Sequence, residues 1–135
     1  MRTIVLAVGR LQPPYADDVQ HYQRLLARHT RLELIEVRED QSVDGRIPKN
    51  AYVCLLAANG TQFDSIEFSR FVDERRLEAR DVCYVIGGPR GIDLEECDLR
   101  LSLGPMTLPH QLARVVLLEQ LFRAHKILAG EPYHY

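Results

Sequence analysis

The chain has 135 residues, of which 46% are hydrophobic and 27% are charged, and its formal net charge is −2. This length and composition suit one soluble globular domain, which we expect to span residues 1–135. The near-neutral charge excludes a non-specific nucleic-acid coat, which needs a strongly basic balance. It does not exclude RNA as a substrate, because a local patch or a dimer cleft can be basic on such a protein.

Membrane, disulfide and metal-binding classes are not favoured either. No segment is long and apolar enough to cross a bilayer, and the first residues begin a strand-like run instead of a signal peptide. Cys54, Cys83 and Cys97 are widely spaced, and no CxxC pair exists. The histidines lack cysteine partners and metal-type spacing. We therefore expect a cytoplasmic protein with no membrane contact, no disulfide framework and no metal site.

The first half of the chain alternates short apolar runs with a longer amphipathic one. Tyr15, Val19, Tyr22 and Leu26 recur at helical spacing and predict an amphipathic helix. The expected elements are strands at residues 3–8, 32–37 and 52–57, a helix from 15 to about 28, and a polar loop at 38–50.

The second half continues this alternation. Asp64 stands three residues before Glu67, which is the spacing of a helix N-cap and its reciprocal partner. Leu117, Leu121 and Leu128 lie on one face of the longest helical pattern, which Gly130 and Pro132 are expected to end. The other expected elements are a helix after Asp64, a strand at Val82–Ile86, an acidic helical turn at 94–97 and an extended segment at 99–103.

Strands that alternate with helices predict an α/β domain with a largely parallel sheet, in which ligands bind beyond the carboxyl ends of the strands. Gly60, Gly87-Gly88 and Gly104 each follow an apolar strand. Any one of them could be an ordinary turn glycine, but together they favour a cleft where backbone approaches a ligand closely. Neither GxGxxG nor GxxxxGK[ST] is present, so no dinucleotide fingerprint or phosphate loop is expected.

An ordered series of segments carries a resemblance to a known family. In the C-terminal part these are Val85-Ile86-Gly87-Gly88-Pro89 with Gly91, Leu101-Ser102-Leu103, Thr107-Leu108-Pro109-His110, residues 114–121, Arg123-Ala124 and Glu131-Pro132-Tyr133-His134. Residues 6–9 and 34–37 add to the series near the N-terminus. The chain closely resembles the bacterial family of the SPOUT superfamily that methylates N3 of a pseudouridine in large-subunit ribosomal RNA.

The resemblance implies an enzyme that uses S-adenosylmethionine to methylate 23S ribosomal RNA, on the assembled ribosome. It also implies an α/β fold whose C-terminal helix threads a loop to form a deep trefoil knot, although general topology rules disfavour knots. A homodimer is implied, with each cleft completed by the partner. The broad apolar face of the last helix fits a dimer, as it would fit a helix buried within one chain.

The resemblance assigns two groups of site residues. N3 of a pseudouridine is an imide nitrogen that must lose its proton, so a base and a cation are useful beside it. By family position Arg123 would stabilise charge or anchor a phosphate, His134 would be the base because histidine titrates near neutral pH, and Tyr133 would stack on or hydrogen-bond the target base. The residues implied to bind the cofactor are Leu56, Gly87, Leu103, Gly104, Pro105, Met106, Thr107 and Leu108.

Each assignment has a structural alternative. Arg123 could be a solvated helix residue, and Tyr133 and His134 could belong to a frayed tail. His110 is expected to shape the cofactor loop more than to act on substrate.

The chain also departs from the family pattern. Residues 41–50 are too few for the helix that the family carries between the second and third strands, so this crossover should be tight or irregular. Ala57 and Arg90 stand where the family often has acidic residues. Two alternatives therefore stay open: a relative that binds the cofactor or the ribosome without methylating, and a flavodoxin-like ligand-binding module, which the missing phosphate loop disfavours.

Overall fold

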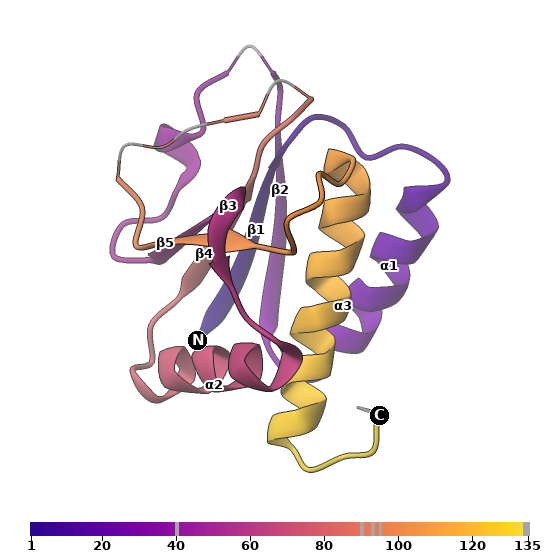
Figure 1. The fold of residues 1–135 in the computed structure, drawn as a ribbon, viewed down its shortest axis with the longest axis vertical. Helices are drawn as coiled ribbons and strands as arrows, with labels where there is room; N and C mark the ends of the chain where they lie inside the picture. Colours follow the sequence, from indigo (N-terminus) through magenta and orange to yellow (C-terminus); the bar gives the residue numbers. More distant parts are fainter. Residues whose placement is uncertain (40, 90, 93, 95, 134–135) are drawn as a thin grey trace.

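A computed structural model describes residues 1–39, 41–89, 91–92, 94 and 96–133 (Figure 1). Strands and helices alternate along most of the chain, as the sequence predicted. In chain order the elements are β1 (Arg2–Val8), α1 (Tyr15–Leu26), β2 (Arg31–Val37), the short 3-10 helix η1 (Asp44–Arg46), β3 (Tyr52–Gln62), α2 (Ser65–Leu77), β4 (Val82–Ile86), β5 (Leu99–Ser102) and α3 (His110–Leu128).

The strands form one sheet in the order β2-β1-β4-β3-β5, and all four pairings are parallel. β4 is buried along its whole length and β1 at every residue after Arg2, which is why both read as continuous apolar runs instead of alternating ones. The α/β class with a parallel sheet is therefore confirmed. Strand order alone does not trace the passage of α3 through a loop, so the trefoil knot stays an implication of the family.

The two faces of the sheet are covered differently. All three α-helices pack on one face, where Val19, Phe68 and Leu117 join one apolar core with residues of the strands. The opposite face has its own core, and there the cover comes from irregular segments that contribute Val43 and Leu94. Figure 1 shows α1 and α3 on one side of the strands and these loops on the other. The short β2–β3 connection explains the difference, because its described part contains η1 and no α-helix.

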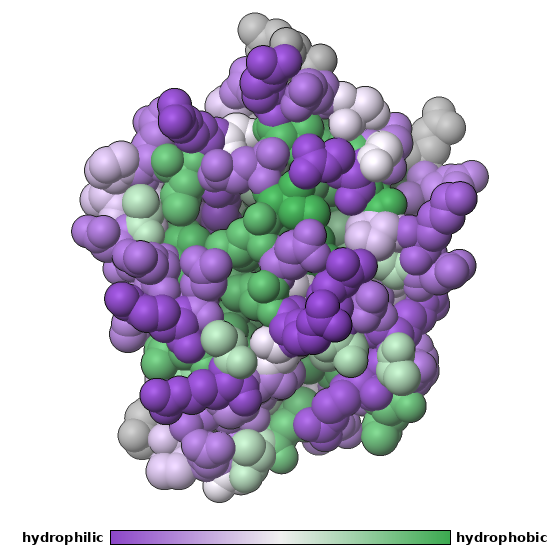
Figure 2. All heavy atoms as spheres, turned by 180° about the vertical axis from the view of Figure 1, so that it is seen from behind, coloured by the Kyte–Doolittle hydropathy of each residue, from purple (hydrophilic) through white to green (hydrophobic). Residues whose placement is uncertain are grey.

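The edge strand β2 leaves apolar side chains partly open. Leu34 and Ile35 are half-buried, and no further strand pairs with β2. From behind, the molecule shows a band of apolar surface along its middle with hydrophilic side chains on either side (Figure 2).

The predicted start of α2 is confirmed in detail. The Asp64 carboxylate accepts a hydrogen bond from the Glu67 amide at 2.7 Å, and the Glu67 carboxylate accepts one from the Asp64 amide at 2.9 Å. This reciprocal pair satisfies two amides that the helix itself leaves without partners.

The third strand is longer than predicted, and the expectation for Gly60 was wrong. Pairing between β3 and β5 shifts register between Leu56 and Thr61 and then resumes, so Gly60 lies inside the strand. A Cβ at Gly60 would stand 2.5 Å from the carbonyl oxygen of Arg100. Gly60 therefore permits a close approach of two backbones and does not open a ligand loop. The acidic turn predicted at residues 94–97 falls partly outside the described residues, and those described there are not helical.

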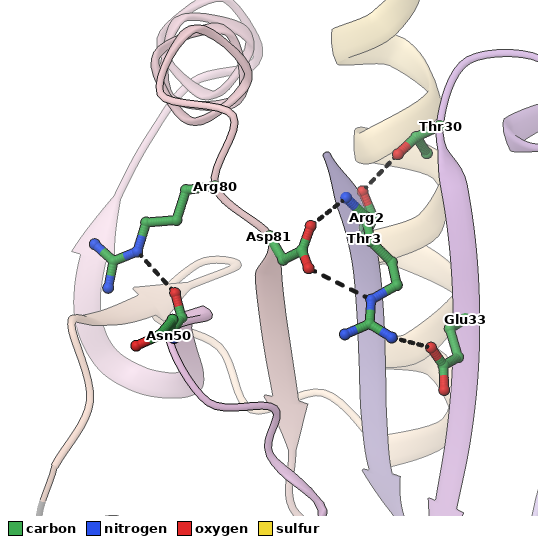
Figure 3. Close-up of polar contacts among 7 residues, drawn as sticks. All are labelled: Arg2, Thr3, Thr30, Glu33, Asn50, Arg80 and Asp81. Atoms are coloured by element: carbon green, nitrogen blue, oxygen red, sulfur yellow. Dashed lines mark hydrogen bonds and ion pairs between the residues drawn. The ribbon is translucent and has the colours of Figure 1, made fainter.

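Polar contacts fix the amino-terminal ends of the central strands (Figure 3). The Arg2 amide donates to Asp81 Oδ1 at 2.6 Å, and its guanidinium Nη1 donates to Glu33 Oε2 at 3.0 Å. The hydroxyls of Thr3 and Thr30 lie 3.0 Å apart. These contacts lie at the end of the sheet opposite to the one where a ligand is expected.

α3 carries one buried histidine near its C-terminal end. The rings of His125 and His29 are stacked with their centroids 5.6 Å apart, and His125 is 5% exposed. Burial, with smaller contributions from the neighbouring His29 and from Arg76, lowers the pKa of His125 to about 4. His125 is therefore neutral in the folded protein near pH 7.

We expect Gly60→Ala to lower the free energy of unfolding by about 2 kcal/mol, because the new methyl group would overlap the Arg100 backbone. Urea unfolding followed by circular dichroism measures the change. Gly45→Ala is the matched control, since nothing lies within 4 Å of a Cβ at that position. Equal midpoints for the two variants would contradict the close approach.

The stability of the protein should depend on pH through His125. Its folded pKa of about 4 lies below the ordinary histidine pKa of 6.5, so protonation favours the unfolded chain. The contribution is full above pH 6.5 and is lost as the pH falls toward 4, by up to about 3 kcal/mol. Urea midpoints at pH 7.5, 5.5 and 4.5 should therefore fall less steeply with decreasing pH for His125→Leu than for wild type, whereas the exposed-site control His21→Leu should follow wild type. A pH dependence that His125→Leu leaves unchanged would contradict this assignment.

Candidate functional site

A cavity of about 680 Å³ lies beyond the carboxyl end of β4, beside the middle of β3 and against the first turn of α3. Its walls come from the middle of β3, the loop after β4, the segment between β5 and α3, and α3 itself. The residues that line it are Leu56, Ala57, Ala58, Ile86, Gly87, Gly88, Pro89, Gly91, Ile92, Leu101, Leu103, Gly104, Met106, Thr107, Leu108, Pro109, His110 and Ala113. The volume is typical of sites for small organic ligands.

The structure brings most of the expected cofactor residues to this one cavity. Leu56 and Gly87 line it, as do Leu103, Gly104 and residues 106–108, whereas Pro105 is not among the lining residues. Sequence reasoning missed Ala113, which joins His110 in the wall. The helical spacing of three residues between them was the available signal, because it places both on one face of α3.

Close backbone packing shapes the loop after β4. A Cβ at Gly87 would lie 2.7 Å from Ile92 Cγ2 and 2.9 Å from its amide nitrogen, so this loop folds tightly back on itself. A side chain at position 87 is incompatible with that fold. Peptide groups therefore form much of this wall.

Ser102 connects the loop after β5 to the middle of β3 by hydrogen bonds. Its hydroxyl donates to the carbonyl oxygen of Ala58 at 3.0 Å and accepts from the Gly104 amide at 3.1 Å. Gly104 has φ +137°, a conformation that side chains rarely adopt. The segment from Leu103 to Leu108 is thereby held over the cavity.

The chemistry of the lining is apolar, with peptide groups as its polar component. Among the lining residues that the structure describes, His110 has the one titratable side chain, and Thr107 adds a hydroxyl. Such a pocket suits a flat, largely uncharged ring system that is recognised through backbone amides and carbonyls. The lining residues that the structure describes offer no cluster of charge for a phosphate.

The second group of candidates lies toward the other end of α3. Arg123 Nε stands 3.2 Å from Glu119 Oε2, and its guanidinium lies over the Tyr133 ring at 4.8 Å from the centroid. The Tyr133 hydroxyl donates to Glu119 at 3.3 Å, and the ring packs edge-on against Phe122. Tyr133 is thus docked and half-buried, which contradicts a frayed tail at that position. His134 lies outside the described residues.

Burial raises the pKa of Tyr133 to about 12, and the adjacent Glu119 carboxylate acts in the same direction. Near neutral pH the phenol therefore keeps its proton and acts as a hydrogen-bond donor. The neighbouring guanidinium of Arg123 only partly offsets these effects.

Glu119 is a site residue that sequence reasoning missed. Besides its contacts with Arg123 and Tyr133, it accepts a hydrogen bond from Gln120 Nε2 at 2.7 Å, and Gln120 in turn accepts one from Ser65 at 2.7 Å. The signal was an acidic residue four positions before an arginine on one helix face. We call the group Glu119, Arg123 and Tyr133 the α3 polar cluster.

The cavity and the α3 polar cluster do not meet within one chain. His110 is on the first turn of α3, and the helical rise of about 1.5 Å per residue places Arg123 about 20 Å farther along the axis. In Figure 1 the chain leaves α3 at the end opposite to the loop that enters it. The two sets of predicted residues are thus at opposite ends of one rigid element.

The described part of the chain shows neither a metal-binding group nor a membrane-spanning helix. No group of three or more His, Cys, Asp or Glu residues described by the structure could hold a metal ion. None of the described helices is apolar over a length that would cross a membrane.

The sequence as a whole matches known proteins. A family model described as "Predicted SPOUT methyltransferase" matches residues 1–134. Curated relatives include proteins named ribosomal RNA large subunit methyltransferase H from Gemmatimonas aurantiaca (37% identical), Clostridium kluyveri (36%) and Acetivibrio thermocellus (34%), each aligned over 99% of both chains. The alignment to the first covers 153 positions, so this relative has residues without a counterpart in the shorter chain.

Proposed function

The chain belongs to the SPOUT methyltransferase family, and on that premise we propose that it transfers a methyl group from S-adenosylmethionine to large-subunit ribosomal RNA. The observation that carries the proposal is the near full-length similarity to relatives named ribosomal RNA large subunit methyltransferase H. The finer proposal is that the acceptor is N3 of a pseudouridine and that the substrate is the assembled ribosome.

The cavity fits the adenosine part of this cofactor. Its apolar lining and peptide groups suit a planar base, and the small side chain of Ala57 leaves room beside it. We assign binding to Leu56, Gly87 and the segment 103–108. When bound, S-adenosylmethionine supplies the electrophilic methyl group.

We propose that two copies of the chain build each complete site. Arg123 and Tyr133 are too far from the cavity of their own chain to act on a nucleotide there, so a partner would supply them. The half-buried apolar residues Leu112 and Val116 on α3 offer surface for such pairing, as does the exposed side chain of Met106 beside the cavity. A symmetric dimer would complete both sites at once.

The α3 polar cluster has the chemistry that an imide nitrogen requires. We assign to Arg123 the stabilisation of the negative charge that develops when N3 loses its proton. Glu119 fixes the direction of that guanidinium, and the Tyr133 phenol stays protonated and can donate to a base carbonyl. His134 is our candidate for the proton acceptor.

We expect the purified protein to methylate large ribosomal subunits that lack the modification, because its sequence carries every residue that we assign to the proposed site. The measurement is transfer of label from methyl-labelled S-adenosylmethionine, followed by nucleoside analysis of the rRNA digest. A methylated pseudouridine is the expected product. Label in a different nucleoside would overturn the proposed target, and cofactor binding without transfer would identify a non-catalytic relative.

Subunit complementation tests the shared site. We expect Arg123→Ala to lower turnover by at least about 100-fold and Ala57→Trp, which fills the cavity, to abolish cofactor binding. In a statistical mixture of the two variants, half of the dimers are mixed and each holds one intact composite site, so about a quarter of wild-type activity should return.

Each variant alone, and Arg76→Ala on α2, serve as controls. Arg76 pairs with Asp73 within α2 at i,i+3, much as Arg123 pairs with Glu119 within α3 at i,i+4, but it lies outside the proposed site. A mixture as inactive as its components would show that both groups act within one chain.

A further inference from the structure

The first turn of α3 is joined to the loop after β1 by a set of polar contacts that the proposed function does not use. The Arg114 side chain is 4% exposed, and its Nη1 donates to Glu36 Oε2 at 2.8 Å. Its Nη2 donates to the carbonyl oxygen of Gly9 at 3.2 Å. One buried guanidinium thus bridges α3, the end of β2 and the turn after β1.

The loop after β1 is held by the same residues and by a neighbour. Glu36 also accepts a hydrogen bond from the Leu11 amide at 2.7 Å, and the Gln111 side chain accepts one from the Gln12 amide at 2.8 Å. We call Glu36, Gln111 and Arg114 the α3 clamp. It fixes backbone groups of the loop directly against the helix.

The clamp stands immediately behind the cavity wall. Gly9, whose carbonyl Arg114 holds, lies against the His110 ring, with a Cβ position 3.7 Å from His110 Nε2. On the other side a Cβ at Gly88 would lie 3.3 Å from Val8 Cγ1. Both the α3 wall and the β4-loop wall of the cavity therefore rest on the end of β1.

Among the described residues, no side-chain cap fixes the start of α3. Pro109 occupies the N-cap position and makes no side-chain cap hydrogen bond. The direction in which the first turn presents His110 and Ala113 to the cavity therefore depends on tertiary contacts. We propose that Glu36 and Arg114 are positioning residues that hold this wall in the geometry that binds the cofactor. This inference rests on the proposed function.

The electrostatics make Glu36 the sensitive member of the pair. Arg114 Nε is buried and has no hydrogen-bond partner among the described residues, so the guanidinium relies on its two remaining contacts. Loss of the Glu36 charge would leave a buried cation facing one neutral carbonyl, and the side chain would move toward solvent. The first turn of α3 would move with it.

The matched control is an ion pair on the same strand. Glu33 pairs with Arg2 at 3.0 Å at the opposite end of β2, and its side chain is 45% exposed against 43% for Glu36 (Figure 3). Glu36→Gln and Glu33→Gln thus remove the same charge from equally exposed positions. They differ in whether the lost contact reaches the cavity wall.

The test is calorimetric titration of each full-length variant with S-adenosylmethionine. We expect Glu36→Gln to weaken binding about tenfold and Glu33→Gln to stay within about twofold of wild type. Turnover of Glu36→Gln at saturating cofactor should remain close to wild type, since the defect is in binding. Equal affinities for the two variants would overturn the inference, whereas a wild-type protein that ignores the cofactor would overturn the proposed function itself.

Hydrogen exchange without ligand supplies a second readout. The amides of Leu11 and Gln12 should exchange faster in Glu36→Gln and in Gln111→Ala, respectively, and stay protected in Glu33→Gln. Gln111→Ala carries no change of charge, so it also tests the clamp if Glu36→Gln fails to fold. A folded Gln111→Ala variant could show faster exchange in the loop and yet bind the cofactor with unchanged affinity. This result would overturn the inference, because the clamp would then stabilise the loop without positioning the cavity wall.

Discussion

α3 is a continuous helix of 19 residues, and its rigidity is the constraint on which the arrangement of the site depends. Its first turn forms a wall of the cavity, while Arg123 projects several turns later. A helix cannot shorten, so these two groups cannot meet within one chain. The proposed sharing of sites between two subunits follows from this length. Because Tyr133 packs against Arg123, the α3 polar cluster is already assembled within a single chain.

The unequal cover of the sheet follows from the short β2–β3 connection, whose described part contains no α-helix. The helical face carries the larger core, and the other face is closed by side chains from loops, such as Val43 and Leu94. The cavity does not lie within either of these two covers alone, because its walls come from β3, the segments after β4 and β5, and α3. The described residues of the short β2–β3 connection therefore help to cover the sheet without forming a wall of the cavity.

Patterns of neighbouring residues predicted most of the helices and strands of this molecule. Contacts between residues distant in sequence could not be predicted in this way. The Asp64 capping box and the strand-end loops that carry Gly87 and Gly104 could be read from neighbouring residues. The extension of β3 could not, because Gly60 looks like a turn residue until the Arg100 backbone is placed beside it. The Glu36–Arg114 pair was equally hidden, since nothing local tells a buried arginine from a solvated one.

Glu119 serves Arg123 and Tyr133 with the same carboxylate. The orientation of the guanidinium and the attachment of the chain after Gly130 are therefore thermodynamically coupled, although they belong to different segments. Substitutions at the three positions should have non-additive effects, because whichever is made first already removes much of what the others would disturb. The three residues of the α3 polar cluster therefore contribute to stability as one coupled unit.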